Sequence, residues 1–508
     1  MKTFLLILSS AILLSLSFHP LGLHFLAWFG LIPVLFVASK AKLSKTFLIG
    51  IFLGFLFSLL SLFWIVFLQI ETNIKILMLF GMVLMFLYIG LYFAIGFLLA
   101  RFLGLWFLPF VVAGLEYLKG LGELGFPWLS LGYSQARYPL IIQQASIYGV
   151  YGISFWLVLI NVSLFYAIRS RSFKYFVMSI VFFLAPILYG YFRIHNIPQP
   201  AEHIMVGIVQ PNIDPNLKFS AAMRDETFQR LLRLSEMCQE KSPHEKLDLI
   251  VWPETATPIF IRTPGFYQNA VFELANRLDV PIFTGTPLYD RSKHEIYNGA
   301  VLIEPQKGIT QEYKKLHLVP FGEHIPFDKY VPLFRKIDFG EGDYSPGNEY
   351  TVFSTENIRF SCLICFESIF PEISREFVKR GARLLTNITN DGWFGKISGP
   401  QQHNDMAILR TVETGVPLVR SANTGISMMV DQCGRILEEV GLFEEHIIVC
   451  PVPMLEIKTV YVAIGDILWL MSLVLIPVLL IIKVLLKKTH GRSSAIVSLF
   501  STLFLTFG

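Results

Sequence analysis

Long apolar runs constrain the fold of this chain more than any other feature of its sequence. A helix needs about 20 mostly apolar residues to cross the roughly 30 Å hydrocarbon core of a bilayer. Six runs of that length are clear: Leu21–Ser39, Thr46–Ile70, Ile74–Ala100, Ala145–Ile168, Tyr175–Phe192 and Val460–Leu486. Phe4–Phe18 is weaker because it is short, and Gly104–Leu118 is weaker because it contains Glu116. The sequence therefore predicts a multi-span α-helical membrane protein.

The composition supports this class and excludes others. Hydrophobic residues make up 54% of the chain and charged residues 16%, which is not typical of a soluble protein. The formal net charge of +4 is small and dispersed, so nucleic acid is not an expected partner. Five cysteines in 508 residues do not make a disulfide framework, and an odd number leaves at least one thiol free.

The apolar runs divide the chain into parts. We expect about seven transmembrane helices in residues 1–195, a soluble domain over 200–455, a last transmembrane helix over 460–487 and a cytoplasmic tail over 488–508. Met1–Ser17 also resembles a signal peptide, but no small-x-small cleavage site follows it, so we expect a retained first helix.

Basic residues in alternate connections predict the orientation. Cytoplasmic connections are rich in Lys and Arg. If the N-terminus is cytoplasmic, every cytoplasmic connection carries basic residues, namely Lys40, Lys42, Lys45, Arg101, Arg169, Arg171, Lys174, Lys487, Lys488 and Arg492. The soluble domain then lies outside the cytoplasm.

Strand and helix patterns alternate in the soluble domain, which is typical of an α/β fold. We expect strands at Val206–Gln210, Leu247–Trp252, Pro281–Thr284, Gly299–Ile303, Ile309–Tyr313 and Arg383–Ile388, with further strands closing the domain by Pro451. We expect helices at Ser220–Lys241, Gly265–Leu278, Ser368–Lys379 and Gln401–Thr414.

A further predicted strand, Asn357–Glu367, delivers Cys365 to a turn at its end, where the thiol would be exposed. Two ordinary interpretations remain open. Free cysteines are often small buried hydrophobes. Cys362 and Cys365 also form a CxxC pair, although residues three apart on a strand point to opposite faces and cannot easily share a bond or an ion.

Two more chemically useful residues follow predicted strands, Glu254 and Lys315. A thiol nucleophile needs a base or a lowered pKa, and a carboxylate can supply the base. An ammonium can stabilise the oxyanion that acyl transfer creates. Taken singly, Glu254 could simply cap a turn and Lys315 could be solvated beside Lys314.

The segment from Phe321 to Tyr350 has little regular patterning and many apolar side chains, including Phe334 and Phe339. Loops of this length are often functional lids, and exposed apolar residues need a partner. We expect a mobile lid that contacts lipid, with an Ω-loop packed on its own domain as the alternative.

Sequence strings around these residues resemble a known family. VWPE, KLHLVPFGE, CFE and NDGWFG occur in an order that resembles the carbon-nitrogen hydrolase (nitrilase) superfamily and its Glu-Lys-Cys triad. With the membrane spans, the chain resembles the apolipoprotein N-acyltransferase family within it. Three further segments are similar to that family: Gly125–Gln135, Val206–Ile213 and Ser345–Tyr350.

The resemblance implies a fold and a site. It implies an inserted nitrilase-like αββα sandwich, with Glu254 as general base, Lys315 as oxyanion stabiliser and Cys365 as nucleophile, and no metal or organic cofactor. It also assigns supporting or substrate-binding roles to Glu323, Glu367, Trp128, Trp393, Phe366 and Phe219, the last two standing where some members have Tyr and Trp.

The resemblance implies an activity as well. An acyl chain passes from a membrane phospholipid, typically phosphatidylethanolamine, through a Cys thioester to the N-terminal amine of diacylglyceryl-cysteine on an apolipoprotein. The enzyme would be a monomer in the bacterial inner membrane with its catalytic domain in the periplasm. Two alternatives remain: a membrane-anchored nitrilase or amidase that hydrolyses a small C–N substrate, and a transporter or scaffold, which predicts charged residues within the spans.

The orientation is directly testable. A reporter enzyme that is active only outside the cytoplasm should be active when fused after Pro200 and inactive when fused after Arg171, because the predicted spans place these residues on opposite sides. The reverse pattern of reporter activity would overturn the predicted topology.

Overall fold

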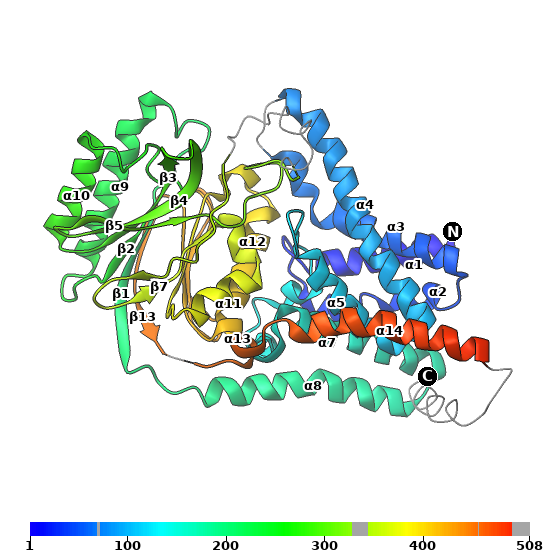
Figure 1. Cartoon of the computed structure of the whole chain (residues 1–508). Helices are drawn as coiled ribbons and strands as arrows, with labels where there is room; N and C mark the ends of the chain where they lie inside the picture. The colour runs from blue at the N-terminus through cyan, green and yellow to red at the C-terminus, as the bar shows by residue number, and fades with distance from the viewer. Residues whose placement is uncertain (69–71, 328–343, 456, 490–508) are drawn as a thin grey trace.

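The computed structural model describes residues 1–68, 72–327, 344–455 and 457–489. Figure 1 shows two parts side by side. A helical part contains both the N-terminal helices and α14, and a sandwich of two sheets with helices on its outer faces is built from the segment between them. This arrangement confirms the predicted fold class.

The helical part is built from ten α-helices in the described residues. They are α1 Lys2–Leu16, α2 Ile32–Ala38, α3 Leu43–Ser61, α4 Thr72–Leu103, α5 Leu108–Lys119, α6 Pro139–Ile142, α7 Ala145–Ser170, α8 Phe173–His195, α13 Val460–Ile464 and α14 Ile467–Thr489. Five of them, α3, α4, α7, α8 and α14, are long and apolar enough to cross a membrane.

Three predicted spans differ from the observed helices. Leu21–Ser39 forms a 3₁₀ helix, His24–Trp28, followed by the short α2, because Pro33 lies in the first turn of α2 and proline starts helices rather than continuing them. Thr46–Ile70 leaves the helix at Ser61 and continues as a 3₁₀ helix, Phe63–Phe67. The final run breaks at Gly465, whose φ of +58° ends α13.

The sandwich contains two large sheets. The six-stranded sheet has the order β13-β1-β2-β3-β4-β5, with bounds His446–Met454, Glu202–Gln210, Leu249–Val251, Ile282–Asp290, Glu295–Glu304 and Gly308–Lys314. The five-stranded sheet has the order β12-β11-β10-β9-β8, with bounds Ile436–Val440, Ser427–Val430, Leu418–Ala422, Leu385–Thr389 and Leu363–Ile364. A small sheet pairs β6, Phe353–Ser354, with β7, Arg359–Phe360.

Helices cover the outer faces of both sheets. Helices α9, Ala221–Lys241, and α10, Phe266–Leu278, lie on the six-stranded sheet, far from the helical part (Figure 1). Helices α11, Pro371–Lys379, and α12, Ser398–Thr414, lie between the five-stranded sheet and the helical part. Strand β2 pairs in parallel with β1 and β3 in one sheet, and β9 pairs in parallel with β8 and β10 in the other. Both strands are buried at every residue, since the facing sheet covers one side and helices the other.

Helix α12 joins the two parts. All of its residues except Gln401 and Asp405 are buried, although many are polar. Partners in the helical part satisfy these polar groups. Glu413 Oε1 accepts a hydrogen bond from the Val150 amide at 2.9 Å, and Arg410 Nη2 donates to the Tyr133 hydroxyl at 3.3 Å. Buried polar groups need such partners. The two parts are therefore held together by specific contacts.

Most predicted elements of the sandwich are present with shifted ends. Helices Ser220–Lys241, Gly265–Leu278 and Gln401–Thr414 are confirmed as α9, α10 and α12. The helix predicted from Ser368 begins only at Pro371. The predicted lid falls largely on residues 328–343, including Phe334 and Phe339, which lie outside the described residues.

Candidate active site

Cys365 lies at a sharp turn at the end of β8. The predicted strand to Glu367 is wrong, because β8 ends at Ile364 and Cys365 begins a 3₁₀ helix, Cys365–Ile369. The φ of Cys365 is +50°, a left-handed conformation that costs a non-glycine residue roughly 1–2 kcal/mol. The side chain is half-buried, and Cys362 is a separate buried free thiol. The turn presents one sulfur beyond the end of the strand.

Lys315, directly after β5, is buried between two carboxylates. Its Nζ lies 2.8 Å from Glu323 Oε1 and 3.7 Å from Glu254 Oε1, and its side chain is 1% exposed. Asn298 on β4 joins the two acids, because its Nδ2 donates to Glu254 Oε1 and to Glu323 Oε1, each at 2.8 Å. Buried charges persist when they are paired and hydrogen-bonded in this way.

Burial and mutual charge shift the pKa values of these groups. Burial raises the pKa of the Cys365 thiol, the Glu254 carboxylate raises it further, and Lys315 opposes both effects. Burial also raises the pKa of Glu254, against the influence of Lys315. For Lys315, burial favours the neutral amine, but Glu323 and Glu254 outweigh it and raise its pKa, so the ammonium stays charged. The structure thus brings a thiol, a basic carboxylate and a fixed cation into one electrostatic unit.

Glu367 supports the turn that carries Cys365. Its Oε2 accepts from the Ile364 amide at 2.7 Å, and its Oε1 accepts from the Tyr313 hydroxyl and the Leu316 amide, both at 2.7 Å. The side chain is fully buried, and burial raises its pKa to about 7 against these hydrogen bonds. Glu367 therefore ties β8 to the segment that holds Lys315.

The four aromatic residues to which the resemblance assigns supporting or substrate-binding roles lie in different surroundings. Trp128, from the helical part, is buried against Phe394, and its Nε1 donates to Gln402 Oε1 at 2.9 Å. Phe366 is buried against Phe370. Trp393 is half-buried.

Phe219 is 53% exposed and lines a hollow with Phe260 and Ile296. It follows Lys218, which contacts the main chain of Glu254. Phe219 therefore lies next in the chain to a residue that contacts Glu254. Among the described residues, no contact joins its ring to Glu254, Lys315 or Cys365.

Several residues of the site were missed from the sequence. Lys218 is buried, and its Nζ donates to the Glu254 carbonyl oxygen at 2.9 Å and to the Thr255 hydroxyl at 3.0 Å. Burial lowers the pKa of Lys218 to about 7, although Glu254 opposes the shift. Neither Lys218 nor Asn298 belongs to a motif with a recognisable spacing, so only the fold shows their roles.

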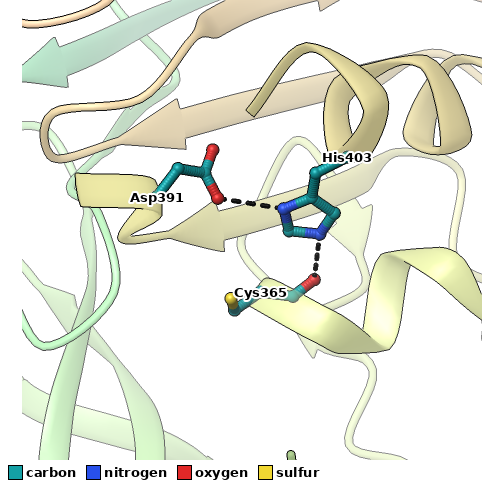
Figure 2. Close-up of side chains that lie close together, drawn as sticks. All are labelled: Cys365, Asp391 and His403. Carbon is teal, nitrogen blue, oxygen red and sulfur yellow. Dashed lines mark hydrogen bonds and ion pairs between the residues drawn. The ribbon is translucent and has the colours of Figure 1, made fainter. Parts of the chain in front are cut away.

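Asp391 and His403 were missed as well. Asp391 and a nitrogen of His403 lie with the Cys365 sulfur in a cluster whose ligand-type atoms are all within 4.8 Å of one another (Figure 2). Such a set could suit a metal ion, but the Arg420 guanidinium lies 2.7 Å from Asp391 Oδ2, and His403 Nε2 lies 3.1 Å from the Cys365 carbonyl oxygen. These contacts use the atoms that a cation would need.

Comparisons with known proteins agree with the two-part structure. Residues 205–460 match the carbon-nitrogen hydrolase family, and residues 10–163 match the apolipoprotein N-acyltransferase N-terminal domain. An apolipoprotein N-acyltransferase of Geobacter metallireducens is 36% identical over 485 residues, covering 92% of both chains. One of Chlorobaculum tepidum is 32% identical and covers 92% of this chain and 93% of its own. The crystal structure of Saccharomyces cerevisiae Nit3, from the nitrilase superfamily, covers 53% of this chain and 95% of its own, at 20% identity and a TM-score of 0.40.

The role of Glu367 as a support is testable by stability. Replacing Glu367 with Gln should lower the free energy of unfolding by about 1–3 kcal/mol. One carboxylate oxygen becomes an NH₂ group, which cannot accept the hydrogen bond that a backbone N–H donates to that oxygen in the wild-type protein. Thermal unfolding in detergent measures the change. Glu372→Gln, on an exposed side chain of α11, should leave the midpoint nearly unchanged, and equal midpoints for both variants would contradict the role.

Proposed function

The chain belongs to the apolipoprotein N-acyltransferase family of carbon-nitrogen hydrolases, and we propose that it works through a thioester on Cys365. It is an acyltransferase of the bacterial inner membrane that uses a lipid donor and a lipoprotein acceptor. The observation that carries the proposed mechanism is the buried ammonium of Lys315, which lies between Glu254 and Glu323. The charges of Lys315 and Glu254 both act on the pKa of the Cys365 thiol, whose backbone is strained.

In the first half-reaction Glu254 takes the proton of the Cys365 thiol, and the thiolate attacks the ester carbonyl of a phospholipid. The resulting oxyanion develops near the Lys315 ammonium, which needs no reorganisation to stabilise it. When the tetrahedral intermediate collapses, the ester C–O bond breaks and the lysophospholipid alkoxide receives the proton from Glu254. The acyl chain remains on sulfur.

In the second half-reaction the α-amine of the diacylglyceryl-cysteine attacks the thioester carbonyl. Glu254 takes a proton from the attacking amine, Lys315 again faces the oxyanion, and the C–S bond breaks. The thiolate recovers the proton from Glu254. One ester bond is lost and one amide bond is formed, with no oxidant or other reactant.

The surroundings suit these roles. A carboxyl group whose pKa is raised is a better proton acceptor for a thiol than an ordinary exposed acid. Glu323 holds the ammonium at 2.8 Å, so Lys315 is oriented before substrate arrives. Its other oxygen accepts from the Val319 amide at 2.8 Å, which fixes the carboxylate itself. Glu323 therefore orients the cation, while Glu254 exchanges protons.

The finer points of substrate and placement belong to the same proposal. The donor is phosphatidylethanolamine, the acceptor is the N-terminal diacylglyceryl-cysteine, and the enzyme is a monomer with its sandwich in the periplasm. The basic residues in the connections predicted to be cytoplasmic support this placement. So does α8, whose C-terminal end leads into the sandwich while the α7–α8 turn lies at the opposite end of the helix (Figure 1).

The proposed mechanism can be tested without the acceptor. Given phospholipid alone, wild-type protein should accumulate a hydroxylamine-sensitive thioester, release lysophospholipid, and discharge the acyl chain when a diacylglyceryl-cysteinyl peptide is added. Cys365→Ala should carry no acyl chain, and Glu254→Gln should be almost as empty because no base replaces the carboxylate. Lys315→Met should slow loading by on the order of 10²–10³, the usual effect of losing one oxyanion donor.

Two results would refute the mechanism. Lysophospholipid released only when both substrates are present would mean direct transfer without a covalent relay on Cys365. A thioester that discharges to water as fast as to the peptide amine would mean that the chain acts as a hydrolase, the alternative function considered from the sequence.

The pH dependence of loading tests the link between Lys218 and Glu254. The Lys218 ammonium lowers the pKa of Glu254, so Lys218→Met should raise it and move the acidic limb of the loading rate to higher pH. Because the pKa of Lys218 is about 7, wild-type Lys218 is charged at pH 6 and mostly neutral at pH 8. The loading rate of Lys218→Met should therefore fall further below the wild-type rate at pH 6 than at pH 8.

Lys307→Met provides the matched control, because Lys307 is an exposed lysine paired with Glu304 on the surface. Its pH profile should equal that of wild type. A Lys218→Met profile that is unshifted, or shifted to lower pH, would contradict the electrostatic link.

A further inference from the structure

His403, near the start of α12, contacts the main chain of Cys365. Its Nε2 lies 3.1 Å from the Cys365 carbonyl oxygen, and its Nδ1 lies 2.9 Å from Asp391 Oδ1. Figure 2 shows the ring between the two, with the sulfur of Cys365 on the side of the residue away from its carbonyl. The histidine therefore approaches the nucleophile through its backbone.

The histidine is held in a buried network. His403 and Asp391 are each 1% exposed, and Arg420 on β10 is fully buried. The Arg420 guanidinium lies 2.7 Å from Asp391 Oδ2 and also bonds Asn387, whose Nδ2 donates to the Leu363 carbonyl oxygen at 2.7 Å. The network therefore contacts the chain on both sides of the turn, at β8 and at Cys365.

The contact is placed where the backbone is strained. Cys365 has a φ of +50°, and strained residues persist only when their surroundings over-determine them. Its carbonyl oxygen has two donors, His403 Nε2 and the Ser368 hydroxyl, the latter at 2.9 Å. Without His403 only the Ser368 hydroxyl would still donate to this oxygen, so one of the two side-chain restraints on the carbonyl would be lost. Losing the histidine would therefore favour relaxation of the turn.

The neighbouring residue ties the same helical turn to the helical part. Gln402 Oε1 accepts from Trp64 Nε1 at 3.2 Å and from Trp128 Nε1 at 2.9 Å. Its Nε2 donates to the carbonyl oxygens of His19 and Ser61, at 2.9 and 3.0 Å. Both ends of this amide are thus occupied by groups from the helical part. Through α12, the turn at Cys365 has a defined position relative to the membrane-spanning helices.

We infer that His403 is a positioning residue for acyl transfer, which fixes the main chain of Cys365 so that its sulfur faces Glu254 and Lys315. The inference rests on the proposed function of Cys365 as the nucleophile. His403 exchanges no proton with the thiol, because Nε2 is directed at the carbonyl oxygen and Nδ1 at Asp391 (Figure 2). Its role differs from that of the histidine in a Cys-His-Asp triad, which must act as base.

Two substitutions separate positioning from base catalysis. Gln can donate an N–H to the Cys365 carbonyl oxygen but cannot accept a proton at neutral pH, whereas Leu can do neither. His403→Leu should slow thioester formation by on the order of 10–10², with the half-saturating phospholipid concentration unchanged, since small misplacements of reacting groups have effects of this size. His403→Gln should recover most of the rate.

The rates are compared per folded molecule, with folding judged by thermal unfolding. Thr411→Val is the matched control on α12, because Thr411 is similarly buried and its hydroxyl donates to the Ile408 carbonyl oxygen of the same helix. It should load at the wild-type rate. If His403→Leu does not fold, Ser368→Ala removes the other donor to the same carbonyl and should give a smaller loss of the same kind.

The outcomes are distinguishable. Loading of His403→Leu at the wild-type rate would overturn the positioning role. Equal loss in folded Leu and Gln variants would also overturn it, in favour of a base. A wild-type protein that forms no thioester would instead refute the proposed function of Cys365.

Discussion

The site depends on a buried ammonium held between two carboxylates. The Lys315 side chain is 1% exposed, so it lacks the conformational freedom of a lysine in solvent. Because an unpaired charge would be expensive there, Glu254 and Glu323 must both approach, and Asn298 must join them. Lys315 and Glu323 follow β5, Glu254 follows β2, and Asn298 lies on β4, so the order of strands in one sheet decides whether the cluster can form. Cys365 comes from the facing sheet, directly after β8, and the packing of the two sheets brings it to the cluster.

Helix α12 fixes this cluster relative to the helical part. One turn of the helix carries Gln402, bonded to the helical part, and His403, bonded to the main chain of Cys365. Farther along, Glu413 accepts from Val150 beside the kink of α7 at Gly149. The proposed reaction uses a lipid donor and a lipoprotein acceptor, so the position of the Cys365 thiol relative to the long apolar helices matters to it. A rigid polar helix can set that position in a way that a flexible tether cannot.

From the sequence, candidate site residues could be predicted only where they carry a local signal. Cys365, Glu254 and Lys315 each follow a recognisable strand, and their strings resemble one family. Lys218 and Asn298 had no such signal, because their roles arise from contacts between residues far apart in the chain. The left-handed backbone of Cys365 was also missed, since its apolar neighbours continue the strand pattern up to the turn. Among the apolar runs, length alone could not show that Pro33 and Gly465 divide two of them.

The most direct test of this account is peptide-level mass spectrometry of protein purified from membranes. The account predicts that the peptide containing Cys365 carries a fatty acyl mass, that hydroxylamine at neutral pH removes it, and that the buried thiol of Cys362 remains unmodified. Acylation of Cys362 or of another cysteine in place of Cys365, or the same acyl mass on that peptide in Cys365→Ala protein, would contradict it.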